Sequence, residues 1–476
     1  MQEPLAAMEI KMAGIENVLK AAESGFKSSL ERLFALLRIP SISADPAYKV
    51  DCQKAADWLV LQLREMGFEA AARPTTGHPM IVAHYLPKGA SPKTPHVLFY
   101  GHYDVQPVDP LELWHTKPFE PTLKKGADGV ERIYARGAED DKGQMMTFVE
   151  AARAWISATG SLPIKATFLI EGEEESGSPS LIPFLQANKA ELSCDVAFVC
   201  DTNMWDAKTP AITTRLRGVV HEEVTVTSPS IDLHSGLYGG AAMNPIRALS
   251  KMIAGLHDKN GRVAIPGFYD GVSALPKVTQ KQWAGLKFSE KKFLGAIGLK
   301  SAAGEKNHSA LEQIWARPTA EVNGMWGGYI GAGGKTVIPS KAHAKLTFRL
   351  VGKQNPKKIL AAFHKFAKSQ MPKDAVITFS GEGGGNAASE ISENNRFIQK
   401  SAAALKAEFN KETVLIGSGG SIPIVRSFKE ILDMDSVLVG FGLEDDAIHS
   451  PNEKYNLSSF QRGIKSWARI IGALTE

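Results

Sequence analysis

The stretch "VLFYGHYDVQPVDP", residues 97–110, decides the fold class. Residues 97–100 are apolar without a break, which is typical of a strand that is buried on both faces in a parallel sheet covered by helices. That strand runs directly into Gly101, His102 and Asp104. Because burying a histidine and a carboxylate without partners is costly, we expect a binding partner for both side chains at the end of this strand.

Other parts of the chain repeat the pattern of a buried strand. Largely apolar runs occur at 166–170, 196–199 and 437–439, and helical patterns such as residues 144–157 lie between the strands. Short apolar runs that alternate with helices indicate an α/β domain. The sequence therefore predicts a mostly parallel sheet that is flanked by helices.

The middle of the chain follows a different pattern. Residues 219–228 and 342–352 alternate apolar with polar side chains, as strands with one wet face do. Two segments that begin with Asn-Pro, at Asn244 and Asn355, have the N-cap and N1 residues of helices. This region is expected to be an inserted α+β domain. The predicted domain limits are 1–211, 212–380 and 381–476.

Composition excludes several classes of protein. The 55 basic and 51 acidic residues give a net charge of only +4, and no basic run suggests a nucleic-acid partner. Three cysteines, an odd number without a CxxC pair, favour a reducing compartment over a disulfide framework. The N-terminus lacks a secretory apolar segment, and no long uncharged apolar stretch follows. We expect a cytoplasmic protein that binds neither nucleic acid nor a membrane.

Acids and histidines follow each predicted buried strand. In open α/β sheets the ligand crevice lies at the carboxyl edge of the strands, so these side chains are expected to converge. Several carboxylates at one place repel one another unless a multivalent cation holds them, and histidine with carboxylate suits zinc, or manganese and cobalt. The residues concerned are His102, Asp104, Glu171, Glu173, Glu174, Glu175, Asp201 and the acids and histidine of "GFGLEDDAIHSPNE", residues 440–453.

Each piece alone also fits a simpler interpretation. The His102 and Asp104 pair could be a hydrogen-bonded surface couple, and "EGEEES" from residue 171 could be a solvated loop. "AEDDKGQ", residues 138–144, could be a charged turn. "GSGGSIP", residues 417–423, could be a plain turn or a phosphate-binding nest, although no GK[ST] follows it. Their joint placement after buried strands favours the metal site.

Five separated motifs resemble those of a known family. They are "GHYDVQPVD", "ARGAEDDKGQ", "EGEEESGSPS", "DLHSGLYGG" and "IHSPNEKY". In this order they resemble the dinuclear zinc peptidases that include carnosinases, cytosolic nonspecific dipeptidases, carboxypeptidase G and aminoacylases. The resemblance runs from about residue 30 to the C-terminus and is closest to the carnosinase and cytosolic dipeptidase branch.

The resemblance implies a role for each residue of the metal site. Asp140 would bridge two divalent metal ions, most simply zinc. His102 and Asp201 would complete one site, and Glu175 and His449 the other. The same resemblance implies a cis peptide bond between Asp140 and the residue that follows it.

The resemblance also implies the catalytic groups. Asp104 would fix the tautomer of His102, and Glu174 would be the general base on a metal-bridging water. An unligated glutamate next to a ligated one can accept the proton of the water and later pass it to the leaving amine. Glu173 stands where relatives often have a neutral residue, so its charge beside the base is a departure from the family pattern.

The inserted domain resembles the family's lid and dimerisation domain. Arg349 of "TFRLVG" would grip the substrate carboxylate through two hydrogen bonds, although a strand-surface role is the simpler interpretation. Ser421 and Thr336 resemble further substrate contacts. His234, otherwise a surface or hinge residue, would reach the active site of the second subunit and stabilise the oxyanion there. A homodimer is therefore expected.

The predicted function is a metal-dependent dipeptidase that acts on small unblocked dipeptides. Within the family, an aspartate at the position of Asp201 is typical of dipeptidases and aminopeptidases, whereas a glutamate is typical of carboxypeptidases and N-acyl amino acid hydrolases. An N-acyl amino acid amidohydrolase or carboxypeptidase-like hydrolase is the alternative on the same scaffold. A catalytically silent amino-acid-binding protein is disfavoured because Glu174 and every ligand position are filled.

Overall fold

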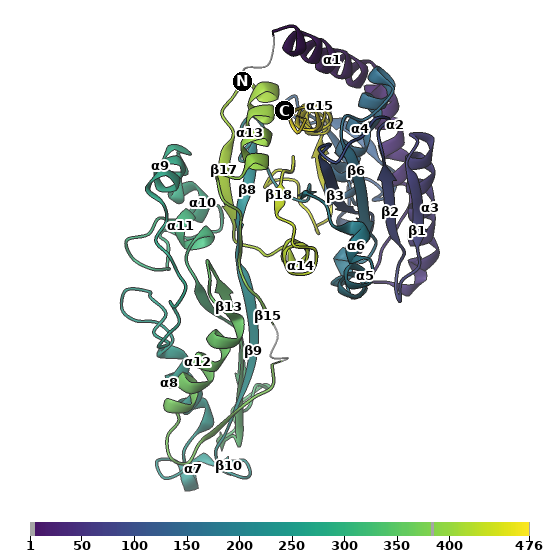
Figure 1. Ribbon diagram of the computed structural model, residues 1–476. Coiled ribbons are helices and arrows are strands. Elements are labelled where there is room, and N and C mark those ends of the chain that lie inside the picture. The colour runs from purple at the N-terminus through teal and green to yellow at the C-terminus, as the bar shows by residue number, and fades with distance from the viewer. Residues whose placement is uncertain (1–4, 382–384, 476) are drawn as a thin grey trace. The chain divides into compact units, whose positions relative to one another are not determined.

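The computed structural model describes residues 5–381 and 385–475, and its chain divides into two compact units (Figure 1). Unit 1 contains the residues up to 214 together with 391–415 and those from 427 onward. Unit 2 contains residues 215–390 and 416–426. The predicted insertion at 212–380 lies close to the first segment of unit 2, but the sequence pattern did not indicate the second segment. The boundary that was predicted after residue 380 is therefore more complex, because the chain enters unit 1 at residue 391 and returns to unit 2 at residues 416–426.

The main sheet has a parallel centre and antiparallel flanks. Its strand order is β1-β2-β6-β3-β7-β18-β8-β16, with β17 paired to β8. The neighbours β6, β3, β7 and β18 run parallel, while β2 is antiparallel to β6 and β8 is antiparallel to β18. The strands are β1 (Glu69–Arg73), β2 (Met80–Tyr85), β3 (His96–His102), β6 (Lys165–Glu171), β7 (Val196–Val199), β8 (Ala211–Leu216), β16 (Ser389–Glu390), β17 (Val414–Ser418) and β18 (Ser436–Leu438). The predicted α/β class is confirmed.

Helices cover the sheet of unit 1 and bury an aromatic core (Figure 1). The Trp467 ring packs edge-on against Phe99 and Phe198, with ring centroids 5.8 and 5.5 Å apart. Phe148 and Phe168 extend the same cluster. The helices of this unit are α1 (Leu5–Ser24), α2 (Phe26–Leu37), α3 (Lys49–Glu65), α4 (Lys142–Thr159), α5 (Leu181–Ala187), α6 (Lys189–Leu192), α13 (Arg396–Phe409) and α15 (Leu457–Ala473); α14 (Pro423–Leu432) begins in unit 2 and ends in unit 1.

A smaller sheet and three short turns complete unit 1. Its strand order is β19-β5-β4, with β19 (Lys454–Asn456), β5 (Glu131–Tyr134) and β4 (Thr122–Lys125) all antiparallel. The 3-10 turns span Pro46–Tyr48, Leu111–Leu113 and Glu174–Ser176. The last of these turns begins three residues after β6, at the carboxyl edge of the parallel strands.

Unit 2 is built on an antiparallel sheet with one covered face. The strand order is β11-β13-β9-β14, with β15 also paired to β9. Along β13, the odd-numbered Thr347 and Arg349 are only partly buried, while Leu346 and Phe348 are buried in the core. The strands are β9 (Gly218–Thr227), β11 (Thr319–Gly327), β13 (Lys341–Leu350), β14 (Val376–Phe379) and β15 (Gly385–Asn386). The sheet therefore has one apolar, buried face and one polar, partly exposed face.

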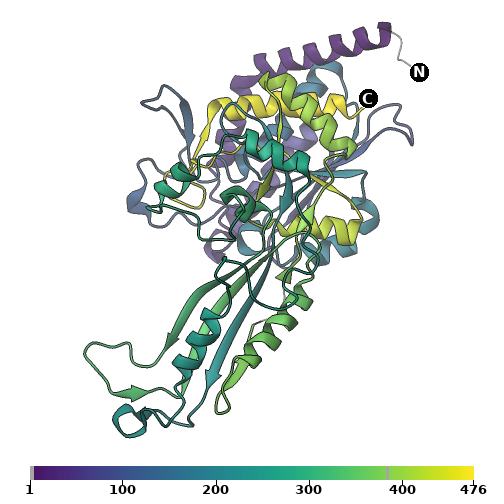
Figure 2. The same ribbon diagram turned by 90° about the vertical axis from the view of Figure 1, so that its left-hand side faces the viewer.

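Two helices cover the apolar face of this sheet. Figure 2 shows α8 (Pro245–Ala254) and α12 (Pro356–Ser369) lying along the long strands. The Asn244 and Asn355 side chains accept backbone N–H hydrogen bonds at the helix starts, as the Asn-Pro pattern predicts. The remaining elements of the unit are β10 (Leu233–His234), α7 (Ser235–Tyr238), α9 (Lys277–Gly285), α10 (Glu290–Ala296), α11 (Ala310–Trp315) and β12 (Val337–Ile338).

Within the described residues, every helix is too short or too polar to cross a lipid bilayer.

Candidate metal centre

Two groups of possible metal ligands meet at one carboxylate in unit 1. The first group is His102, Asp140 and Asp201, and the second is Asp140, Glu175 and His449. Within each group the ligand atoms lie within 4.8 Å of one another. Asp140 belongs to both groups, so the structure brings together the five residues that the sequence singled out as ligands.

The fold explains why these five residues converge. His102 is the last residue of β3, Asp201 follows β7, and Glu175 lies in the 3-10 turn after β6. These three strands run parallel, so their carboxyl ends share one edge of the sheet. Asp140 lies in the loop before α4, and His449 lies in the loop after β18.

His102 has the environment of a metal ligand. It is fully buried, and its Nε2 has no hydrogen-bond partner among the described residues. Its other nitrogen, Nδ1, lies 3.1 Å from the backbone oxygen of Asp104 and 3.3 Å from Asp104 Oδ1. A proton on Nδ1 leaves the Nε2 lone pair directed at Asp140 Oδ1, 3.3 Å away. A buried imidazole nitrogen with no hydrogen bond fits a cation at this position.

The charges of the second group also fit a cation. His449 Nε2 lies 2.9 Å from Asp140 Oδ2 and 3.2 Å from Glu175 Oε2, and these contacts raise the pKa of His449 to about 10. Burial raises the pKa of Asp201, and the charges of Asp140 and Asp141 raise it further. Carboxylates that are this crowded and buried need compensating positive charge, which divalent ions supply.

The Asp104 carboxylate organises more than the neighbouring histidine. Its Oδ1 accepts the backbone N–H of Glu174 at 3.2 Å, and its Oδ2 accepts that of Glu175 at 3.0 Å. One buried carboxylate thus orients His102 and also holds the turn that carries both glutamates. The sequence predicted only the contact between Asp104 and His102.

A second buried carboxylate holds the loop that carries Asp140. Glu453 accepts the backbone N–H groups of Gly137, Glu139 and Asp140 at 2.9, 3.0 and 3.2 Å. It also forms a buried ion pair with Arg136 Nη1 at 2.7 Å. The Asp140–Asp141 peptide bond is cis, as the resemblance implied. Sequence reasoning assigned no role to Glu453, although it lies in the quoted motif "IHSPNEKY".

Two further polar contacts orient the ligands. Gln106 Nε2 donates to Glu175 Oε2 at 2.8 Å, and the backbone N–H of His102 donates to Asp141 Oδ2 at 3.0 Å. Neither Gln106 nor Asp141 was given a role in ligand orientation at the sequence level. Gln106 lies in the opening stretch, four residues after His102, so its position was a usable signal.

Glu173 has a structural role that explains the departure from the family pattern. Its side chain accepts the backbone N–H of His78 at 2.8 Å and that of Ser180 at 3.1 Å. A Cβ atom at Gly77 would lie 1.4 Å from Glu173 Oε1, so the 77–78 loop closes directly on this carboxylate. The Glu173 charge is thus held by backbone groups rather than placed beside the base.

Glu174 has the electrostatics of a proton acceptor. Burial raises the pKa of its carboxyl group, His102 opposes that rise, and Glu175 adds to it. The residue belongs to neither ligand group. A carboxylate whose pKa is raised from its usual value lies closer to the pH at which general bases work best.

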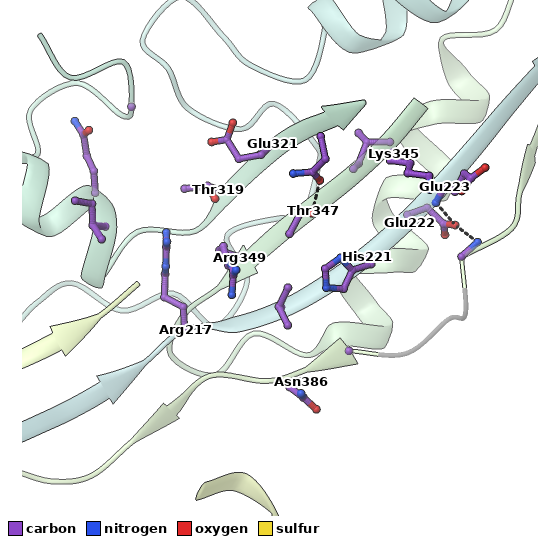
Figure 3. Close-up of a pocket in the computed structure, with 18 of the residues that line it drawn as sticks. Arg217, His221, Glu222, Glu223, Thr319, Glu321, Lys345, Thr347, Arg349 and Asn386 are labelled. Carbon is purple, nitrogen blue, oxygen red and sulfur yellow. Dashed lines mark hydrogen bonds and ion pairs between the residues drawn. The ribbon is translucent and has the colours of Figure 1, made fainter. Parts of the chain in front are cut away.

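Arg349 and Ser421 lie in unit 2, where Arg349 lines an open cavity of ≈ 1250 Å³ on the polar face of the sheet (Figure 3). Arg217, which sequence reasoning missed, lines the same cavity. Its backbone N–H and its Nε donate to the carbonyls of Gly420 and Gly419, at 3.1 and 2.9 Å. Ser421 directly follows that turn, so Arg217 links the Ser421 segment to the cavity.

His234 and Thr336 lie together elsewhere in unit 2. Thr336 Oγ1 is 3.5 Å from His234 Nε2, and both residues are exposed. The short pairing of β10 with β12 places them near Lys341, at the start of β13. Arg349 lies eight residues further along that strand, which corresponds to about 26 Å of extended chain. Within one subunit the structure does not bring His234 to Arg349.

Comparison with known proteins decides the family. The model of the peptidase family M20/M25/M40 matches residues 98–473. The chain belongs to this family. The Cys-Gly metallodipeptidase DUG1 of Candida albicans is 30% identical over 458 residues, which cover 92% of this chain and 92% of that protein. The Beta-Ala-His dipeptidase of Homo sapiens is 30% identical over 390 residues, which cover 80% of this chain and 75% of that protein.

A solved structure agrees with this assignment. The M20 family metallo-carboxypeptidase Sso-CP2 from Sulfolobus solfataricus superposes with a TM-score of 0.77 at 29% identity, and covers 94% of this chain and 99% of that one. The resemblance inferred from the five motifs is confirmed, and the chain is a metallopeptidase of the M20/M25/M40 family.

The Glu453 contacts generate a stability prediction. Glu453→Gln keeps the shape of the side chain but leaves the buried Arg136 guanidinium without its counter-charge. Breaking a buried ion pair in this way costs about 3–5 kcal/mol, so we expect a loss of that size in the free energy of unfolding, measured by urea denaturation.

The matched control is Glu120→Gln, which removes an ion pair of 2.7 Å whose side chains, on Lys117 and Glu120, are 77% and 65% exposed. An exposed pair contributes less than about 1 kcal/mol. Equal and small effects of both substitutions would show that Glu453 does not hold the Asp140 loop.

Proposed function

We propose that this chain is a metal-dependent dipeptidase that hydrolyses the peptide bond of small unblocked dipeptides. The observation that carries the proposal is the Asp140 carboxylate, which is shared by two groups of ligand atoms next to the unligated Glu174. Two similar proteins bear names that refer to Cys-Gly and Beta-Ala-His dipeptides, which supports a dipeptide substrate here.

The five converging residues would hold two divalent ions. His102, Asp140 and Asp201 would bind one ion, and Asp140, Glu175 and His449 would bind the other. Their nitrogen and carboxylate donors suit zinc, with manganese and cobalt as alternatives. When bound, such ions polarise the scissile carbonyl and lower the pKa of the attacking water.

Glu174 is the proton carrier in this proposal. It takes the proton of the attacking water and returns it to the nitrogen of the leaving amine, so that one carboxyl group serves as base and then as acid. The two N–H contacts to Asp104 keep its turn in place, and Asp104 also fixes the tautomer of His102.

Substrate binding is assigned to two places in unit 2. Arg349 and Ser421 would bind the substrate carboxylate, while His234 and Thr336 would contact the same substrate from a second subunit. The support for a second subunit is geometric: an extended dipeptide spans only about 7 Å, far less than the separation of about 26 Å along β13. Residues 212–380 would then act as the lid and dimerisation domain of a homodimer.

A cytoplasmic location belongs to the same proposal. Cys52, Cys194 and Cys200 are all free thiols, as expected in a reducing compartment.

The solved structure of a metallo-carboxypeptidase at 29% identity favours one alternative, a carboxypeptidase-like or N-acyl amino acid hydrolase. The two functions differ in their need for a free amino group on the substrate. A dipeptidase should hydrolyse a free dipeptide much faster than its N-acetylated counterpart, and the alternative requires the reverse order.

The proposed function predicts metal-dependent turnover. Chelation should abolish hydrolysis of a dipeptide library that includes Cys-Gly and β-Ala-His, because the ligand groups then lose their cations. Adding back zinc, manganese or cobalt separately should restore the activity to different extents, as measured by release of free amino acids. Full activity of protein whose metal content has been shown to be zero would rule out the proposal.

Glu174→Gln separates the chemistry from metal binding. The amide keeps the shape of the side chain but cannot accept the proton, so we expect kcat to fall by about 10² to 10⁴ with metal content unchanged. Glu173→Gln is the matched neighbour, because it alters a carboxylate held by His78 and Ser180 and should retain most of the turnover. A Glu174→Gln enzyme with nearly normal kcat would remove this residue from the mechanism.

The action of His234 in a second subunit can be tested by mixing two inactive variants of the protein. His234→Ala should fold and keep its metals but lose about 10² to 10³ in rate, because a donor to the developing oxyanion is missing. Exchanging its subunits with those of Glu174→Gln should produce heterodimers with one intact composite site, so hydrolysis should reappear. A fully exchanged mixture that stays as inactive as its parents, or an active monomer, would contradict this arrangement.

A further inference from the structure

Arg217 lies beside Arg349 on the polar face of the unit 2 sheet. Val219 of β9 pairs with Arg349 of β13, and Arg217 lies directly before the first residue of β9. Both arginines line the open cavity, and Figure 3 shows their side chains next to each other. On the neighbouring strand β11, Thr319 pairs with Arg349, and Glu321 lines the same cavity two residues further along.

The two arginines bring positive charge that the surrounding residues leave uncompensated. Among residues 5–381 and 385–475, no carboxylate forms an ion pair with Arg217 or Arg349. Three of the other four charged residues of the cavity wall have partners of their own. Lys345 pairs with Glu223 at 3.6 Å, and Glu222 pairs with His364 at 2.5 Å.

Burial makes this uncompensated charge costly. Burial and the adjacent Arg349 together lower the pKa of Arg217 to about 10, and the charge of Glu321 opposes the shift. Arg217 and Arg349 together with Glu321 carry a formal charge of +1, although the charged residues of the whole cavity wall, three basic and three acidic, sum to zero. A single bound carboxylate would balance the charge of the first three, whereas an uncharged amide would not.

Arg217 is also held in position before any ligand arrives. Its Nε donates to the Gly419 carbonyl, and its backbone N–H donates to the neighbouring Gly420 carbonyl. The two terminal nitrogens of the guanidinium remain for a ligand, and their planar arrangement matches the two oxygens of a carboxylate. Fixing a donor in advance reduces the entropy that is lost on binding.

We propose that Arg217 is a second arginine of the substrate-carboxylate site and forms a clamp with Arg349. This inference rests on the proposed dipeptidase function and deepens it, because it names the residue that makes the enzyme select a free C-terminal carboxylate. The anchored Arg217 determines specificity at the carboxylate, and Ser421 follows the turn to which it is anchored.

The test compares two ligands that differ only in charge at the C-terminus. Binding of L-alanyl-L-alanine and of its C-terminal amide is measured by calorimetry on the Glu174→Gln holoenzyme, in which the ligands survive. Adding Arg217→Gln should weaken binding of the acid by about 10-fold to 100-fold, the loss expected for a charged hydrogen bond. Binding of the amide should change less than about threefold, because it makes no such bond.

Two control substitutions exclude indirect effects. Arg215→Gln removes an arginine two residues away that pairs with Glu390 at 2.8 Å and does not line the cavity. Lys345→Gln removes the same charge from the cavity wall at a residue already paired with Glu223. Both controls should leave the preference for acid over amide unchanged, whereas Arg349→Lys should reduce it.

The outcomes distinguish this proposal from the dipeptidase assignment. If Arg217→Gln weakens binding of the acid and of the amide equally, the proposed clamp is wrong. The same holds if Lys345→Gln reduces the preference for the acid as much as Arg217→Gln does. Neither result affects the proposed dipeptidase function. If Arg217→Gln does not fold, Arg217→Lys takes its place, with intermediate binding of the acid and unchanged binding of the amide expected. If the enzyme without these substitutions hydrolyses no dipeptide under any metal condition, it is the proposed function that fails.

Discussion

The structure of unit 1 depends on one electrostatic constraint, the crowding of carboxylates around Asp140. Three parallel strands deliver His102, Asp201 and the Glu174–Glu175 turn to one sheet edge, and Asp140 stands among them as a member of both ligand groups. Burying these charges without compensation would be prohibitive. Cations at the centre would compensate these charges, and the fold of this edge would then depend on metal binding.

Buried polar residues behind the candidate ligands fix the positions of those ligands. Asp104 joins the end of β3 to the turn after β6, and Glu453 joins the loop of Asp140 to the segment that follows His449. Each accepts two or more backbone N–H groups, so each ties together parts of the chain that are distant in sequence. Positioning of this kind holds ligands within the narrow tolerance that catalysis needs.

The sequence predicted the elements that depend on local pattern, and the family resemblance predicted the five candidate ligands, but other long-range contacts gave no signal. Buried strands such as 97–100 and the Asn-Pro helix starts are local signals, and the structure confirms them. The antiparallel flank of β1 and β2 has no such signal, because strand direction follows from tertiary pairing. Glu453 and Arg217 were missed for the same reason, since their partners lie 313 or more and 202 residues away.

The most direct test of the shared Asp140 carboxylate is a count of bound metal ions per subunit. Metal-free protein is titrated with zinc, and stoichiometry and affinity are compared for the unsubstituted chain, Asp140→Asn and Asp201→Asn. The account predicts two ions for the unsubstituted chain, loss of affinity at one site in Asp201→Asn, and loss at both sites in Asp140→Asn. A single ion in the unsubstituted chain, or an Asp140→Asn protein that still binds one ion with full affinity, would contradict it.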